Sequence, residues 1–434
     1  MHVPKPVRHL LACSIIYTIF PLSLAWGGDA VLTLAEAELM ALQHNPSLSA
    51  VTRQAEAMAA VPSQAGSLPD PTLSFNMLNL PADSFSTSQE AMTQLQLGIS
   101  QAIPFPGKLA LKAEAAKHMA AAAMQNQQEF RLLLLRNTRI HWWNLAYLHQ
   151  ALSIIRHNQD LLRNLVRTAE AKYKTGKGLQ QDVLLAQLEL SKLLEQEMKL
   201  NSALDRERAT LNSLLGREAA IAIVLPASGH TQAMQPALAR TVDTPALKHW
   251  ARDHRPALLA MHDHIEASDS LLALANKDYY PDFKLGAAYG FRSGTTNRQP
   301  RPDMASLMLS MTLPLYSSSK QDRAVDQRMA EKAKAEFSWQ DAANQVDVEI
   351  DTAASDLHLA RKQLSLFEHG ILPQARQTTA SMLAGYQVNK VDFLNLVRAQ
   401  LSEFNFDIQY WQLVSVAHQA EARLAAAAGK ERLE

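Results

Sequence analysis

Apolar and polar residues alternate one by one in four short segments of the chain. In the first segment Leu73, Phe75 and Met77 alternate with polar residues, and three later segments repeat this period of two, which predicts β-strands. The predicted strands lie near residues 72–80, 93–103, 282–292 and 304–313. Each has roughly 9 to 11 residues, enough for a tilted strand to cross a bilayer, although a half-buried strand in a soluble sheet has the same period. A polar stretch of about a dozen residues within each pair favours membrane hairpins with outer loops.

The rest of the chain has the spacing of long helices. Neither Gly nor Pro occurs between Gly107 and Gly176, which predicts one continuous helix of about 100 Å. The following stretch, 179–215, is also free of both residues, and its leucines recur with a four-then-three spacing that predicts an antiparallel coiled-coil hairpin over 107–215. A second hairpin is predicted over 319–428, with a kink where Gly370 and Pro373 interrupt its outward leg.

The chain also repeats itself with an offset of 210 to 213 residues. Asn45-Pro46 returns as Arg255-Pro256, and Tyr173 returns as Tyr386. We therefore predict an internal twofold repeat, with the first unit over 28–240 and the second over 241–434. Each unit has the order helix, two strands, long helix and returning helix.

The N-terminus has the pattern of a secretory signal peptide. Basic Lys5 and Arg8 precede a short apolar run and then small residues, so residues 1–27 are predicted to be removed by a cut near 25–27. The run is shorter than the 18 or more apolar residues that a membrane anchor needs. The single cysteine, Cys13, falls inside this segment, and we expect a mature chain without a lipid or disulfides.

Composition and motifs argue against nucleic-acid binding and catalysis. The 42 basic and 42 acidic residues balance, so there is no electrostatic basis for binding nucleic acid. The sequence contains no His-Glu-x-x-His, phosphate-binding glycine loop or Gly-x-Ser-x-Gly. His262 and His264 point to different faces of a predicted helix, and Trp142-Trp143 lies mid-helix, so packing or solvation explains both better than a site. We expect no enzyme, no cofactor and no metal site.

Four strands cannot close a barrel, and an open sheet edge is not tolerated in lipid, so the chain must assemble. Two copies would supply 8 strands and three would supply 12, and a conducting pore favours three or more because eight-stranded barrels are largely filled by side chains. Proline can end a strand or helix without leaving an unpaired amide, so prolines at the strand ends are predicted joints between a barrel and a helical tube. The predicted joint residues are Pro69, Pro71, Pro104, Pro106, Pro281 and Pro314.

Two stretches carry a resemblance to a known family. Tyr173 to Val183, with Gly176 and Asp182, looks like the hairpin-tip pattern of TolC-like outer-membrane efflux proteins, and the resemblance covers essentially the whole mature chain. Ile103 to Lys108 is similar to the strand-to-helix junction of members that work with heavy-metal pumps of the RND type. This resemblance implies a mainly α fold with a small β part. It also implies a homotrimer with a shared 12-stranded barrel and a coiled-coil α-helical tunnel.

The resemblance further implies a place in the outer membrane, in contact with its lipid, and partnership with a periplasmic adaptor and an inner-membrane RND-type pump. The implied role is a passive exit duct for heavy-metal cations, with drugs, organic compounds or a type I secretion substrate as alternative cargo. A soluble periplasmic adaptor is a third reading, but it predicts neither the strands nor the repeat. Adaptor docking and gating are expected at the hairpin tips, where ordinary turn chemistry is the alternative. The tip residues are Gly176, Lys177, Gly178, Asp182, Asn389, Lys390, Asp392, Asn395 and Arg398. The last two stand where some members carry an acidic pair.

Overall fold

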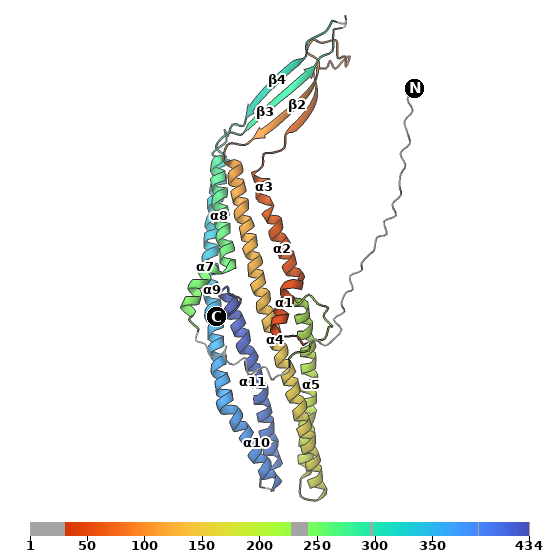
Figure 1. The fold of residues 1–434 in the computed structure, drawn as a ribbon, viewed down its shortest axis with the longest axis vertical. Helices are drawn as coiled ribbons and strands as arrows, with labels where there is room; N and C mark the ends of the chain where they lie inside the picture. The colour runs from red at the N-terminus through yellow and green to blue at the C-terminus, as the bar shows by residue number, and fades with distance from the viewer. Residues whose placement is uncertain (1–30, 227–241, 296, 298, 389, 434) are drawn as a thin grey trace, which may run out of the picture.

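The structure is a computed structural model that describes residues 31–226, 242–295, 297, 299–388 and 390–433. The predicted signal peptide and Asn389 lie outside the described residues. The chain is mainly helical, with a small antiparallel sheet at one end of an elongated body (Figure 1). The helices are α1 (Leu34–His44), α2 (Pro46–Ala59), α3 (Val61–Gly66), α4 (Lys108–Lys174), α5 (Gln180–Leu214), α7 (Thr244–His254), α8 (Pro256–Lys277), α9 (Gln321–Leu366), α10 (Leu372–Gln387) and α11 (Phe393–Ala427).

The sheet has the strand order β1-β2-β3-β4, and every neighbouring pair is antiparallel. The strands are β1 (Thr72–Leu78), β2 (Gln94–Ile103), β3 (Phe283–Phe291) and β4 (Met304–Met311). Their alternation puts large apolar side chains on one face and small or polar ones on the other. Within the described chain, β1 and β4 are each paired on one side only.

Each long helix is accompanied by shorter helices along its whole length. Beside α4, helices α1 to α3 run toward the sheet and α5 runs to the opposite end (Figure 1). In the second half, α8 lies beside α9 toward the sheet, α7 lies beside α9 midway along the body, and α11 lies beside α9 and α10 toward the opposite end. At 67 residues, α4 is about 100 Å long, as the absence of Gly and Pro predicted. None of the described helices combines the length and apolarity required to cross a membrane.

Helix ends follow from local sequence. Pro46 and Pro256 occupy the first positions of α2 and α8, where a proline loses no helical hydrogen bond. Gly216 and Gly429 follow the last turns of α5 and α11 with φ of 67° and 74°, a conformation that favours glycine. A Cβ at Gly216 would also lie 2.2 Å from the His44 carbonyl oxygen, so α5 ends directly against α1.

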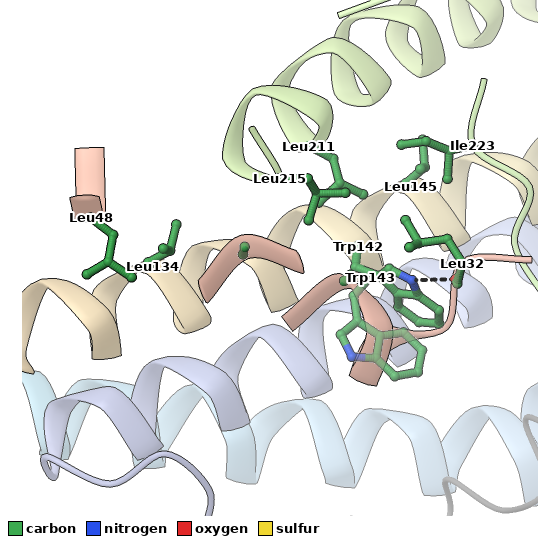
Figure 2. Packing of buried hydrophobic residues seen from close by; sticks show 11 residues of the cluster. Leu32, Leu48, Leu134, Trp142, Trp143, Leu145, Leu211, Leu215 and Ile223 are labelled. Carbon is green, nitrogen blue, oxygen red and sulfur yellow. Dashed lines mark hydrogen bonds between the residues drawn. The ribbon is translucent and has the colours of Figure 1, made fainter. Parts of the chain in front are cut away.

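The largest core cluster lies where α1, α4 and α5 meet. Figure 2 shows Trp142 and Trp143 among leucines of α2, α4 and α5 and of the segments next to them, and both tryptophans are buried. The indole Nε1 of Trp142 donates a hydrogen bond to the Leu32 carbonyl oxygen at 3.2 Å, and the Trp143 ring stacks on His418 at 3.9 Å. The predicted packing role of the Trp pair is therefore confirmed.

The predicted interruption of the second hairpin takes the form of a π-helical turn. Residues Phe367–Ile371 form this turn between α9 and α10, and Pro373 falls in the first turn of α10. The turn is held against α11, because the Tyr410 hydroxyl donates to a Glu368 carboxylate oxygen at 2.7 Å. Proline here therefore accompanies a change of helical hydrogen bonding and does not end the leg.

Candidate functional site: the sheet joints and the hairpin tips

All six predicted joint prolines lie in the connections between helices and strands. Pro69 and Pro71 precede β1, Pro104 and Pro106 separate β2 from α4, Pro281 precedes β3, and Pro314 follows β4. Their φ restriction and missing N–H suit positions where one hydrogen-bonding pattern ends and another begins.

A buried lysine holds two of these connections together. Lys108, the first residue of α4, is 5% exposed, and its Nζ lies 3.0 Å from a carboxylate oxygen of both Asp278 and Asp282. The same Nζ donates to the Tyr280 carbonyl oxygen at 3.3 Å, and the Phe105 amide donates to Asp282 Oδ1 at 2.7 Å. We call Phe105, Lys108, Asp278, Tyr280 and Asp282 the joint cluster. It joins the start of the first long helix to the connection between α8 and β3.

The pKa shifts within the joint cluster show that the lysine and the aspartates stabilise each other's charged forms. Burial alone would lower the pKa of Lys108, but hydrogen bonds and charge attraction from Asp282 and Asp278 raise it above its usual value. Burial would raise the pKa of Asp282, but the Phe105 amide and Lys108 lower it. Lys108 is therefore a cation and Asp282 an anion at neutral pH.

Aromatic stacking completes the joint cluster. The rings of Phe105 and Tyr280 stack with centroids 4.5 Å apart, and Lys277 Nζ lies 5.9 Å and 5.6 Å from the two centroids. Thr312, just after β4, exchanges backbone and side-chain hydrogen bonds with Asp282, so the third connection is tied in as well. The joint cluster therefore connects the start of α4, the end of α8 and the ends of β3 and β4 through direct contacts.

Sequence reasoning named the prolines but missed the charged residues of the joint cluster. One signal was present, because Pro69-Asp70 recurs as Pro281-Asp282. This recurrence drew attention to Asp282. Nothing local indicated its partner, since Lys108 lies more than 170 residues earlier in the chain.

The first hairpin tip is a tight glycine reversal. Gly176 has a φ of 69°, and the Lys177 amide donates to the Lys172 carbonyl oxygen at 2.8 Å, which closes the end of α4. A Cβ on Gly178 would lie 2.9 Å from the Lys172 Cβ, so the chain passes too close for a larger residue. Asp182 then lies in the first turn of α5, where a carboxylate is favoured by the helix dipole.

The second tip closes in a similar way. The Lys390 amide donates to the Gly385 carbonyl oxygen at 2.9 Å, and Asp392 takes the N-cap position of α11 with its carbonyl accepting from the Asn395 amide at 3.2 Å. Asn395 and Arg398 are both exposed in the first turns of α11. These two positions therefore present one neutral and one basic side chain at the start of α11.

The two hairpins contact each other just behind their tips. Lys172 at the end of α4 donates its Nζ to the Tyr386 carbonyl oxygen at 3.1 Å and lies 3.8 Å from the centroid of the Tyr386 ring. Burial, and to a smaller extent the Asp182 carboxylate, raises the pKa of Tyr386. Around this contact Ala186, Leu396 and other buried apolar residues of both hairpins form one cluster. The structure brings the two predicted tips together as one unit.

The histidine-rich segment of α8 makes contacts with carboxylates. His262 Nε2 lies 3.9 Å from Glu266, and His118 of α4 lies 3.8 Å from Asp263. No group of three or more potential ligands occurs among the described residues.

The sheet presents an apolar face to its surroundings. Phe75 is 69% exposed and Leu307 is 91% exposed, and most large side chains of that face are exposed with them. An exposed apolar surface of this kind needs a partner or a lipid environment.

Comparison with known proteins agrees with this architecture. A family model described as outer membrane efflux protein matches residues 39–217 and 247–430. The cobalt-zinc-cadmium resistance protein CzcC of Cupriavidus metallidurans is 21% identical over 393 residues, covering 90% of this chain and 88% of that protein.

Two solved structures show the same fold. The outer membrane protein VceC of Vibrio cholerae has a TM-score of 0.76 at 18% identity, over 92% of this chain and 96% of that one. The channel CusC has a TM-score of 0.75 at 16% identity, over 93% of both chains. The family match covers both halves of the chain, each with its long helical hairpin. The chain therefore belongs to the outer membrane efflux protein family, whose members are passive channels and not enzymes.

Proposed function

We propose that this chain is the outer-membrane subunit of a tripartite efflux system. Three copies form a duct that crosses the outer membrane as a 12-stranded barrel and continues into the periplasm as a helical tube. The observation that carries this proposal is the four-stranded sheet with a large exposed apolar face and an unpaired outer side on both β1 and β4 within the described chain.

Closure by copies follows from hydrogen bonding. In lipid, each unpaired backbone group costs several kcal/mol, so an open sheet is not stable there. In a ring of copies, β4 of one chain would lie beside β1 of the next, and the alternating directions make that pairing antiparallel. Three copies leave room for a pore, which two copies would largely fill with side chains.

The helices also present unpartnered apolar stripes. On α5, Leu184, Leu188 and Met198 are exposed at spacings that share one helix face, and on α9, Leu359 and Leu366 are exposed seven residues apart. In a single chain these residues face water. In a ring of copies the α5 side of one chain can pack against the α9 side of the next, as in a coiled coil.

The internal twofold repeat belongs to this proposal. The two family matches support it, as do the paired glycines Gly216 and Gly429 with equivalent conformations. Three copies of a duplicated chain would make a tube of six similar hairpins, so neighbouring hairpins can meet in similar ways within and between chains.

The tips are the proposed gate and adaptor-docking site. The contact of Lys172 with Tyr386 holds the two hairpins of one chain together, so opening would require that contact to separate. Gly176, Lys177, Gly178, Asp182, Lys390 and Asp392 lie at the end of the tube that a periplasmic adaptor would reach. Asn389 has the same proposed role. The joint prolines, with the joint cluster, hold the barrel on the tube.

Heavy-metal cations are the proposed cargo. The support is the likeness to a protein named for cobalt, zinc and cadmium resistance. A shared duct has no need to recognise its cargo, because the inner-membrane pump selects it.

Two experiments test the proposal. Outer-membrane fractionation followed by electrophoresis with and without heating should show an oligomer that dissociates to one chain on heating. Deleting the gene should sensitise cells to copper, silver, cobalt or zinc. A monomer found only in the soluble fraction would refute the channel. Sensitivity to detergents and dyes alone would replace the metal cargo with organic compounds.

A further inference from the structure

The face of the sheet opposite the apolar face is built mainly from small and polar residues, with Met304 and Met308 of β4 as large exceptions. Strand pairing places Ser74, Gly98, Ala288 and Ser306 in one row, and the next row toward the helices contains Ser100, Gly286 and Met308. A Cβ on Gly98 would lie 2.8 Å from Ser74 Oγ and 3.2 Å from the Ala288 Cβ, so these rows are closely packed. Small residues on one face and large ones on the other suit a sheet that curves with this face inward.

One charged residue interrupts this face. Within the four described strands, Lys284 is the only residue that is charged at neutral pH. It lies in the row formed with Ala102 and Ser310, one row closer to the helices than Gly286. Its side chain is exposed and forms no ion pair among the described residues. Because Lys284 forms no ion pair among the described residues, its ammonium group is free to interact with solutes on this face of the sheet.

We infer that Lys284 gives the barrel an inward ring of positive charge that favours anions over cations. The inference rests on the proposed trimer, in which this face lines the pore and three copies of Lys284 share one level. Rings of Lys or Arg select anions in pores, because the field of several like charges adds inside a narrow aqueous passage. With no carboxylate in the described strands, no opposing charge lies along the barrel wall itself.

The nearest acidic groups lie outside the strands, at the joints. Asp278 and Asp282 each lie 3.0 Å from the buried Lys108, which offsets part of their charge. Asp70 lies two residues before β1 and is exposed, so its carboxylate offsets part of the charge of Lys284 in the wild type. Because Asp70 is the same in every variant, comparing Lys284 with Gln at the same position isolates the contribution of the lysine.

The three Lys284 side chains would determine which chemical form of the metal passes most easily. A free divalent cation meets three like charges at this level, whereas a neutral or anionic complex does not. Metal would therefore leave more readily as a complex with chloride, thiolate or another anionic ligand than as the bare ion. The effect falls with salt, because the Debye length is about 10 Å at 0.1 M ionic strength.

A thiol placed beside Lys284 tests the inference without requiring an open tip. In the purified oligomer, Ser310→Cys puts a thiol across the strand pair from Lys284 on the same face. Its rates of reaction with a negatively charged and a positively charged methanethiosulfonate are measured at low salt. Lys284→Gln in this background should lower the ratio of anionic to cationic rate about fivefold. Lys284→Arg should preserve the ratio.

Controls separate this inference from the proposed channel. Every variant must still migrate as the heat-dissociable oligomer, and Leu309→Cys, on the apolar face, should resist both reagents. If Ser310→Cys reacts but its ratio of anionic to cationic rate is the same with and without Lys284→Gln, the anion preference is wrong. The proposed channel is not affected by that result. If Leu309→Cys reacts and Ser310→Cys does not, the polar face does not line a pore, and the barrel itself is refuted.

Discussion

The two halves of the molecule make the same helix junction with different chemistry. Between α1 and α2, Asn45 donates its side-chain amide to the Leu214 carbonyl oxygen at the end of α5, at 2.9 Å. Between α7 and α8, Arg255 donates to the Ala427 carbonyl oxygen at the end of α11, at 3.2 Å. The backbone contact is equivalent, because in each half the residue before the helix-starting proline binds the last turn of the returning helix.

The surroundings of the two residues differ. The Asn45 side chain also accepts from the Leu48 amide at 2.9 Å and so caps its own helix without any charge. Arg255 lies 2.7 Å from Glu349 of α9 and 3.2 Å from Glu129 of α4, and Glu129 accepts from the Ala257 amide. The first junction uses a neutral side chain, whereas the second joins several helices through a buried guanidinium and two carboxylates.

The apolar cores beside these two junctions differ in the size of their side chains. The first contains Trp142, Trp143 and large leucines, whereas the second is rich in alanine, with Ala251 and Ala420 fully buried. Large side chains bury more apolar area and contribute more to stability than alanines. The comparison teaches that an equivalent contact between two helices can be made by a neutral amide at one junction and by a guanidinium with two carboxylates at the other.

The largest expected effect comes from removing Arg255. Arg255→Ala leaves Glu129 and Glu349 without their partner and the Ala427 carbonyl without a donor. We expect a loss of about 3 kcal/mol in the free energy of unfolding, because breaking a buried ion pair from one side leaves an uncompensated charge. Urea unfolding of the purified oligomer at a fixed protein concentration, followed by helical circular dichroism, measures the change.

A matched variant shows whether charge is the cause. Replacing Arg255 with Met together with Glu129→Gln and Glu349→Gln removes the unpaired carboxylates and should recover much of the loss. If the triple variant is no more stable than Arg255→Ala, the junction depends on the shape of the arginine and not on its charge.

Helices and strands could be predicted because their signals are local. The Gly- and Pro-free stretch after Gly107 fixed the length of α4, and the alternation around Phe75 identified β1. The structure also shows why a charged residue, Glu197, is accommodated within the leucine spacing of α5. Glu197 receives hydrogen bonds from Arg156 at 2.9 Å and from Gln159 at 2.8 Å, both on α4.

Long-range pairings could not be predicted in the same way. The joint cluster depends on Lys108 meeting Asp282, and the second junction depends on Arg255 meeting Glu129. A charged residue in a polar sequence gives no indication of which of many opposite charges it will contact, because that choice is made by tertiary packing. The π-helical turn was foreseen only as a kink, since Gly370 and Pro373 show that a helix is perturbed but not how its hydrogen bonds rearrange.

Asn45→Ala should have a smaller effect than Arg255→Ala. It removes the cap of α2 and the hydrogen bond to Leu214, which together are worth about 1 to 2 kcal/mol, but it leaves no charge unpaired. A loss for Asn45→Ala as large as that for Arg255→Ala would remove the distinction between the halves.

The smallest expected effect is an acid sensitivity of the first hairpin. Hydrogen bonds from Gln159 and then Arg156 lower the pKa of Glu197 below its usual 4.5. A lowered folded-state pKa means that the contribution to stability is complete above about pH 5 and is lost as the pH falls through the folded value. The thermal midpoint of the wild type should therefore fall slightly more between pH 6 and pH 4 than that of Glu197→Gln.

The exposed pair on the same helix, probed by Glu195→Gln, is the control. It should show no such difference, because the ion pair of Glu195 is with Lys199, one turn away on the same helix. Equal acid sensitivity in the wild type and in Glu197→Gln would mean that α4 and α5 are held by their apolar seam alone.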